Sequence, residues 1–256
     1  MRRPAFWRFV IVLGAVLALE LACRTGIIDR VTMVPPSQMV AALVSMSVGA
    51  PWFWPDAGST FRNIAAAIAL SIVPGFLIGL VIHALPRLRA VLNPVFLSYY
   101  SVPTFVFYPL LIVIFGIDSA SLIVMGAMFG IVAMVTATLA SIDRIPRVYG
   151  KVARVTRLNP WQTALRIQLP AATPHLITGI RLAVAYSVIG VIAGEFIIAT
   201  AGLGRRLKLA YNDFDTPTMY GLILLIFIAV AIVNGALQHW ETRIHRIWYG
   251  RRSYRS

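Results

Sequence analysis

The residues of this sequence that could carry out chemistry are few, and they form no recognisable catalytic group. Four histidines are present, at His83, His175, His239 and His245. They show neither the spacing of metal ligands nor an apparent carboxylate partner. Cys23 is the single cysteine, which excludes an intrachain disulfide and a thiol–metal cluster. No glycine-rich loop ending in Lys-Ser or Lys-Thr occurs, so the chain is not expected to hydrolyse ATP itself.

One acidic residue, Glu195, lies inside a long apolar segment. A carboxylate in hydrocarbon costs roughly 2.5–3.5 kcal/mol on insertion scales, so Glu195 must face protein or a wet cavity. Two interpretations follow. Glu195 is either part of a gate or substrate path, or a hydrogen-bond anchor for the loop that contains Gly202 and Gly204.

The composition is that of a membrane protein. Hydrophobic residues make up 59% of the chain and charged residues 12%, with a mean hydropathy of +0.81. About 20 helical residues cross the hydrocarbon core. Six segments meet this requirement: 6–23, 64–85, 96–115, 121–140, 176–199 and 220–238. They lack the alternation of barrel strands, so we expect helices.

The net charge of +14 points to a membrane surface. The cations lie beside apolar runs and no nucleic-acid reader motif is present. With the N-terminus inside, sixteen Lys and Arg residues fall on the inner side and six on the outer side. This bias predicts a multi-pass membrane protein with both termini in the cytoplasm.

The first apolar segment has a second interpretation as a cleaved signal. Arg2 and Arg3 precede a short apolar core, and Ala22-Cys23 resembles a lipoprotein cleavage site. Glu20 occupies a position where such a site requires an apolar residue, which favours an uncleaved helix. Whether this helix is retained stays open.

The predicted layout is a first helix with its outer loop (1–56), a transmembrane domain (57–241) and a basic tail (242–256). The outer loop 24–62 is rich in proline, and Trp52 and Trp54 are expected at the headgroup level. The connection 116–120 is short, so spans three and four form a hairpin. In spans two and three, Pro74-Gly75, Pro103 and Pro109 are expected to kink helices.

The longest inner loop, 141–175, carries the pattern of two short helices. Pro146 favours a first helix over 147–156, and Asn159-Pro160 provides a cap and a first position for a second. Leu165, Ile167 and Leu169 would face the membrane or the bundle in that second helix. Pro170 and Pro174 are expected to end it before span five. The loop is therefore expected to be a rigid lever.

This loop resembles that of the permease subunits of bacterial ATP-binding-cassette importers. Their hallmark is Glu-Ala-Ala, three residues, Gly, nine residues, then Ile-x-Leu-Pro. The second half stands here as Ile167-Gln168-Leu169-Pro170. The spacing places Lys151-Val152-Ala153 at the Glu-Ala-Ala position and Arg157 at the Gly, so three hallmark residues differ.

Further motifs resemble the nitrate, sulfonate and taurine branch of that family, and the resemblance covers about 57–241. They are Val34-Pro35-Pro36-Ser37, Val102-Pro103, Tyr108-Pro109-Leu110, Phe115-Gly116-Ile117-Asp118, Gly194-Glu195-Phe196 and Ala201-Gly202-Leu203-Gly204. The resemblance implies an all-α membrane protein, a six-helix permease of the MetI-like, type I importer kind with cytoplasmic coupling helices.

By this resemblance the chain is a transport subunit of a bacterial inner (plasma) membrane and not an enzyme. It implies a homodimer of permeases, two ATPase subunits that bind ATP and magnesium, and a periplasmic substrate-binding protein. No cofactor is expected on this chain. The branch serves nitrate, sulfonates, taurine, bicarbonate and heterocyclic vitamin precursors, so a small anionic or heterocyclic nutrient is expected.

The implied site residues fall into two groups. The ATPase-coupling loop would use Lys151, Val152, Ala153, Arg154, Arg157, Asn159, Ile167, Leu169 and Pro170. The translocation path or gate would use Tyr99, Tyr100, Pro103, Tyr186, Ser187 and Glu195.

Three features of the first group leave alternatives open. Lys151 reverses the charge that the family places at the ATPase contact; it is either one more inner-leaflet cation or the sign of an altered ATPase partner. Arg157 stands where glycine usually makes a left-handed turn, at a cost of about 1 kcal/mol if that conformation is kept. Alternatively, Asn159, two residues further on, tolerates such a conformation and takes over the turn.

Three other classes of function are weaker. A secondary transporter would need intramembrane coupling charges or inverted repeats, and only Glu195 qualifies. An intramembrane enzyme would need a buried catalytic pair. A membrane scaffold would not need the ordered loop.

Overall fold

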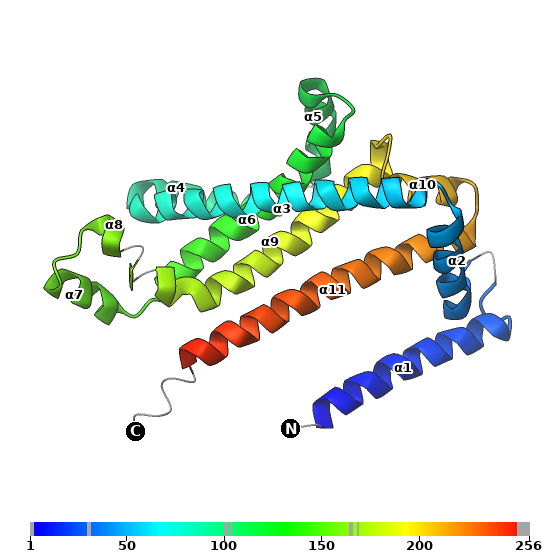
Figure 1. Ribbon diagram of the computed structural model, residues 1–256. Coiled ribbons are helices and arrows are strands. Elements are labelled where there is room, and N and C mark those ends of the chain that lie inside the picture. The colour runs from blue at the N-terminus through cyan, green and yellow to red at the C-terminus, as the bar shows by residue number, and fades with distance from the viewer. Residues whose placement is uncertain are drawn as a thin grey trace. The chain divides into compact units, whose positions relative to one another are not determined.

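The computed structural model describes residues 3–29, 32–99, 102, 104–163, 166, 167 and 169–249, and every regular element among them is a helix. Four helices are long and apolar enough to cross a membrane: Phe53–Ala84, Ser119–Asp143, His175–Ile198 and Thr216–Arg243. They belong to α3 (Phe53–Ala84), α6 (Ser119–Asp143), α9 (Leu169–Ile198) and α11 (Thr216–Tyr249) (Figure 1).

Shorter helices fill the rest of the described chain. They are α2 (Pro36–Gly49), α4 (Pro86–Tyr99), the 3₁₀ helix η1 (Thr104–Phe107), α5 (Tyr108–Phe115), α7 (Arg147–Val155), α8 (Pro160–Thr163) and α10 (Leu203–Asn212). The first apolar segment forms one helix of 22 residues, α1 (Arg3–Arg24), and its role as a span stays a prediction.

The predicted third span, 96–115, in which Pro103 and Pro109 are expected to kink the helix, does not form a single helix over the described residues. α4 ends at Tyr99, and the chain resumes as η1 and α5, which together form an apolar stretch of only Thr104–Phe115. The sequence has Pro103 and Pro109 here, and each proline removes a helical hydrogen-bond donor. Pro103 itself lies outside the described residues. By contrast, α3 continues through Pro74 as one helix of 32 residues.

Two loop predictions also need correction. The outer loop 24–62 contains the helix α2, and α3 begins at Phe53, well before the predicted start of span two. Pro170 and Pro174 do not precede the fifth long helix, because α9 begins at Leu169 and includes both. Pro170 lies in the first turn, where the missing N–H has no intrahelical partner to lose.

The chain forms two compact units over its described residues. The first comprises Met1–Thr60 and Glu195–Ala229, and the second comprises Phe61–Gly194 and Val230–Ser256. α3, α9 and α11 each contribute residues to both. The units are described separately below.

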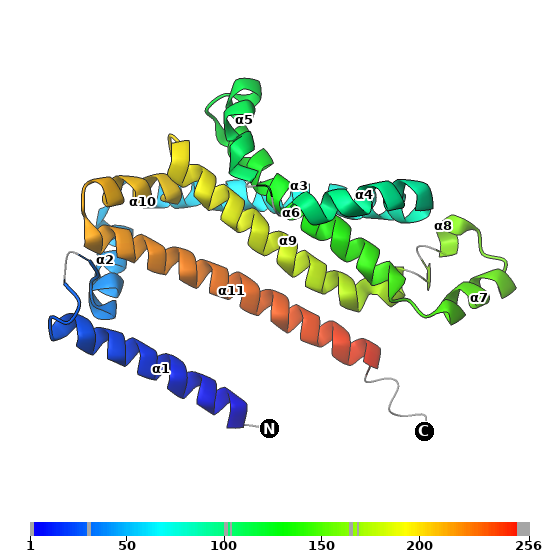
Figure 2. The same ribbon diagram turned by 180° about the vertical axis from the view of Figure 1, so that it is seen from behind.

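Small residues bring α3, α6 and α9 together in the second unit. A methyl group on Gly126 of α6 would lie 2.5 Å from Cγ2 of Val191, 2.9 Å from Cβ of Ala67 and 3.0 Å from the carbonyl oxygen of Ser187. Figures 1 and 2 show α6 and α9 side by side in both views. Helices in lipid associate through such close approaches, since no hydrophobic force drives them together.

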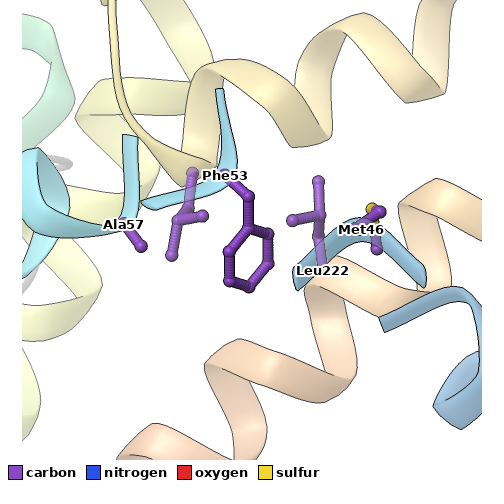
Figure 3. Packing of buried hydrophobic residues seen from close by; sticks show 5 residues of the cluster. Met46, Phe53, Ala57 and Leu222 are labelled. Carbon is purple, nitrogen blue, oxygen red and sulfur yellow. The ribbon is translucent and has the colours of Figure 1, made fainter. Parts of the chain in front are cut away.

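The core of the first unit is a cluster of apolar side chains. Met46 from α2, Phe53 and Ala57 from α3, and Leu222 from α11 pack together with Leu203 of α10 (Figure 3). Leu222 is fully buried. This cluster explains why the outer loop is ordered: α2 and the start of α3 cover the same apolar surface.

Replacing Gly126 by alanine should destabilise the second unit by about 1–3 kcal/mol, since α3, α6 and α9 must move apart. Gly235 of α11 has open space around it. Gly235→Ala should therefore keep or slightly raise the stability. Thermal unfolding of both variants in the same detergent checks this, and equal midpoints would contradict the packing described.

Candidate functional site

The predicted coupling loop contains two helices that meet at a structured turn. α7 ends at Val155, and its last carbonyl groups are satisfied by the turn that follows. The N–H of Leu158 donates to the carbonyl of Ala153 at 3.1 Å, and the N–H of Thr156 donates to that of Val152 at 3.0 Å. The bond from Leu158 is the six-residue closure of a Schellman motif.

Arg157 occupies the left-handed position of this motif, with φ of 52°. Glycine is the usual residue there, because a Cβ atom is crowded in that conformation. The turn expected at Arg157 is therefore kept despite the substitution. The expectation that Asn159 takes over the left-handed conformation is wrong, because it is not among the non-glycine residues with positive φ.

Asn159 instead caps α8. Its Oδ1 accepts a hydrogen bond from the N–H of Gln162 at 2.7 Å, and its own N–H donates to Oε1 of Gln162 at 3.3 Å. This reciprocal arrangement is a capping box, and Pro160 is the first residue of the helix as predicted. The cap predicted from sequence is confirmed, and it fixes the direction in which α8 leaves the turn.

The remaining loop residues differ in exposure. Lys151 and Val152 are exposed, and Ala153 is buried. Arg154 lies in the last turn of α7. The described part of the second helix is α8, Pro160–Thr163. Its predicted continuation at Leu165 and Gln168 lies outside the described residues and stays a prediction.

The Ile-x-Leu-Pro end of the loop joins the core of the second unit. Ile167 is half-buried. Leu169 packs against the cluster of Met134, Ala172, Leu176 and Ala183. Pro170 lies in the first turn of α9, so this end of the loop opens a long helix.

The chain that enters the loop is held by an ion pair. Asp143, the last residue of α6, accepts two hydrogen bonds from the guanidinium of Arg89 in α4, one of them at 2.8 Å. Nδ1 of His83 lies 3.9 Å from Oδ1 of Asp143. The expectation that the histidines lack a carboxylate neighbour is therefore wrong for His83. In the described part of the chain, no group of three metal-ligating side chains occurs.

Glu195 lies in the first unit and is completely buried. Its Oε2 accepts hydrogen bonds from Oγ1 of Thr60 at 2.7 Å and from the N–H of Gly204 at 3.1 Å. A methyl group on Gly202 would lie 2.5 Å from Cδ of Glu195, so glycine is required for this approach. These are the contacts that the anchor interpretation of Glu195 requires.

Two further side chains complete the anchor. Oδ1 of Asp56 accepts from the N–H of Gly202 at 3.1 Å, and Oγ1 of Thr60 accepts from the N–H of Leu203 at 2.8 Å. The first N–H groups of α10, which have no intrahelical partner, are thus satisfied by α3 and α9. The two carboxylates also lie at the positive end of the helix dipole.

Arg206 of α10 closes the same network. Its Nε donates to Oδ2 of Asp56, and its guanidinium carbon lies 4.6 Å from the ring centroid of Trp52. Trp52, expected only as an interfacial anchor, therefore also forms a cation–π contact. Sequence reasoning missed Asp56, Thr60 and Arg206, because their partners are about 135 to 150 residues away in the chain.

The other predicted path residues are not brought into one site. The hydroxyl of Tyr99 donates to the carbonyl of Met128 at 2.8 Å. Ser187 is fully buried, and its Oγ lies 3.1 Å from Oγ of Ser71 between α9 and α3. Tyr186 is half-buried in α9. Tyr100 and Pro103 lie outside the described residues, so a path through these residues stays a prediction.

The fold defines a class of protein: over its described residues, the chain is an all-helical membrane protein. The chain belongs to the family described as binding-protein-dependent transport system inner membrane component, which matches residues 72–246. This family supplies the permease subunits of ATP-binding-cassette importers, so membership removes the secondary-transporter and scaffold alternatives.

Relatives support the assignment to the branch expected from sequence. The chain is 26% identical over 231 residues to the taurine transport system permease protein TauC of Escherichia coli, covering 88% of this chain and 82% of TauC. It is 24% identical over 192 residues to the nitrate import permease protein NrtB of Leptolyngbya laminosa, covering 75% and 68%. An inward-facing structure of the MetNI methionine ABC transporter matches with a TM-score of 0.68 at 18% identity, covering 77% of this chain and 99% of that one.

Replacing Arg157 by glycine should stabilise the loop by about 1 kcal/mol, because the left-handed residue is no longer strained. Asn159→Ala should cost about 1 kcal/mol by removing the cap. Amide hydrogen exchange at Leu158 and Gln162 checks both: slower exchange is expected in the first variant and faster exchange in the second. Unchanged exchange at Gln162 in Asn159→Ala would contradict the capping box.

Replacing Thr60 by valine should loosen α10, because Leu203 loses its acceptor and Glu195 loses a donor, at a cost of about 1–3 kcal/mol. Trypsin cleavage after Arg205 and Arg206 measures the loosening and should become several-fold faster. Asp213→Asn, an exposed acid beyond α10, is the control and should leave the rate unchanged. Equal rates in both variants would show that the anchor does not hold α10.

Proposed function

We propose that this chain is one of two identical membrane subunits of an importer whose power comes from separate ATPase subunits. The two permeases would form the substrate path between them, and the loop 144–168 would lie in the cytoplasm with both termini. ATP and magnesium would bind to the partner ATPases. A periplasmic binding protein would deliver the substrate to the opposite side.

The observation that carries this proposal is the construction of the loop. α7 is closed by a Schellman motif, α8 opens with a capping box, and the chain then enters α9 at Leu169. A loop that only connects two membrane helices needs none of these features. A loop that transmits force needs all of them, because slack in the turn would absorb the movement.

The proposed substrate is a small anionic or heterocyclic nutrient. Support comes from the relatives named for taurine and for nitrate, which are both small and carry an anionic group. Glu195 is not proposed as a ligand for such a substrate, because its carboxyl group is completely buried and is already bonded to Thr60 and Gly204.

The experiment is co-purification of the tagged chain from its host in mild detergent, with mass spectrometry of the retained chains. We expect an ATPase at equal stoichiometry and a second permease copy. Replacing residues 147–163 with a Gly-Ser linker of equal length should abolish ATPase recovery and leave membrane insertion intact.

The matched control is Tyr211→Ala, an exposed residue of α10. It should retain the ATPase at the level of the unmodified chain. Recovery of the ATPase by the linker variant would show that the loop is not the docking element.

A further inference from the structure

The exposed face of α7 combines an apolar stripe with positive charge. Val148, Val152 and Val155 are 56%, 46% and 83% exposed. Their spacing of four and three residues places them on one side of the helix. Lys151 is exposed and precedes Val155 by four residues, so it borders the same stripe. Three exposed valines in a helix of nine residues form an apolar surface that a binding partner would bury.

The charge around this stripe has one sign. Between Asp143 and Glu195 the sequence contains no Asp or Glu. The same loop contains six cations: Arg144, Arg147, Lys151, Arg154, Arg157 and Arg166. The carboxylate at its entrance, Asp143, is already paired with Arg89. Among the described residues, no ion pair to Arg144, Lys151 or Arg157 is found.

The stripe suits a groove in a protein better than a lipid surface. Helices that lie in the membrane interface present Trp, Phe and Leu over a long apolar face. α7 presents three valines over about two turns, which is the pattern of anchors in a helix bound in a groove. The Schellman motif fixes the end of α7 before any partner binds, and such pre-organisation lowers the cost of association.

We propose that α7 docks into an apolar groove of the partner ATPase whose rim carries carboxylates, with one of them facing Lys151. This inference rests on the proposed function and adds the chemistry of the partner surface. An ATPase with a basic residue at that rim would be rejected, because like charges across an interface are strongly unfavourable. Lys151 would thereby select the cognate ATPase.

The chain offers a direct test, because it contains only two lysines, Lys151 and Lys208. A water-soluble carbodiimide joins an amine to a carboxylate only when the two are in contact. In the purified permease–ATPase complex, we expect a cross-link between Lys151 and an Asp or Glu of the ATPase. The cross-link should disappear in Lys151→Arg and persist in Lys208→Arg.

Binding measurements supply the second readout. Lys151→Glu should weaken the affinity of the permease for the ATPase by about tenfold or more, and Val152→Asp by a similar factor. Reversing the cross-linked carboxylate of the ATPase to lysine should restore binding to Lys151→Glu. High salt should weaken the unmodified complex in nanodiscs of phosphatidylcholine as well as of phosphatidylglycerol.

The outcomes separate the inference from the proposed function. If no ATPase is recovered with the unmodified chain, the proposed function fails. If the complex forms but lacks the Lys151 cross-link, and Lys151→Glu binds normally, the acidic groove is refuted while the proposed function stands. Salt sensitivity found only in phosphatidylglycerol, together with no cross-link, would assign the cations to lipid headgroups and also refute the groove.

Discussion

The shape of the loop between α6 and α9 depends on the hydrogen bonds at the turn between α7 and α8. The bond from Leu158 to Ala153 closes the first helix, and the two bonds between Asn159 and Gln162 open the second. Between them stands Arg157, held in a conformation that costs a non-glycine residue about 1 kcal/mol. We propose that this fixed geometry carries movement of α7 towards Leu169 and the long helix α9.

The first unit uses the same construction at the end of α10. Phe214 has φ of 55°, the N–H of Asp215 donates to the carbonyl of Ala210 at 2.9 Å, and Oδ1 of Asp215 accepts from the N–H of Thr218 at 3.2 Å. A left-handed residue is again followed by a polar helix cap, here Asp215 directly after Phe214, whereas Leu158 separates Arg157 from Asn159. α10 is also fixed at its beginning, by the side chains of Asp56, Thr60 and Glu195, while backbone hydrogen bonds close its end.

The sequence was sufficient where a local signal decides the structure. The long apolar runs predicted α3, α6, α9 and α11, and Asn159-Pro160 predicted the start of α8. It failed where prolines and distant contacts decide. The stretch 96–115 has the composition of a membrane span, but only Thr104–Phe115 forms an apolar helical stretch among the described residues. The partners of Glu195, Thr60 and Gly204, could not be predicted from the residues next to Glu195 in the sequence. Helix α2 was not predicted, because Leu222, which packs in the same cluster as Met46 of α2, is far away in the sequence.

We propose that the rigid turn between α7 and α8 couples ATP hydrolysis by the partner ATPase to movement of the membrane helices. The most direct test is the ratio of substrate imported to ATP hydrolysed in proteoliposomes, measured for the unmodified complex and for a variant with Asn159→Ala and Gln162→Ala. We expect that the variant still binds its ATPase and that the complex still hydrolyses ATP, but that it imports several-fold less substrate for each ATP. An unchanged ratio, with faster amide exchange in the turn, would show that rigidity at this point is not required for transport.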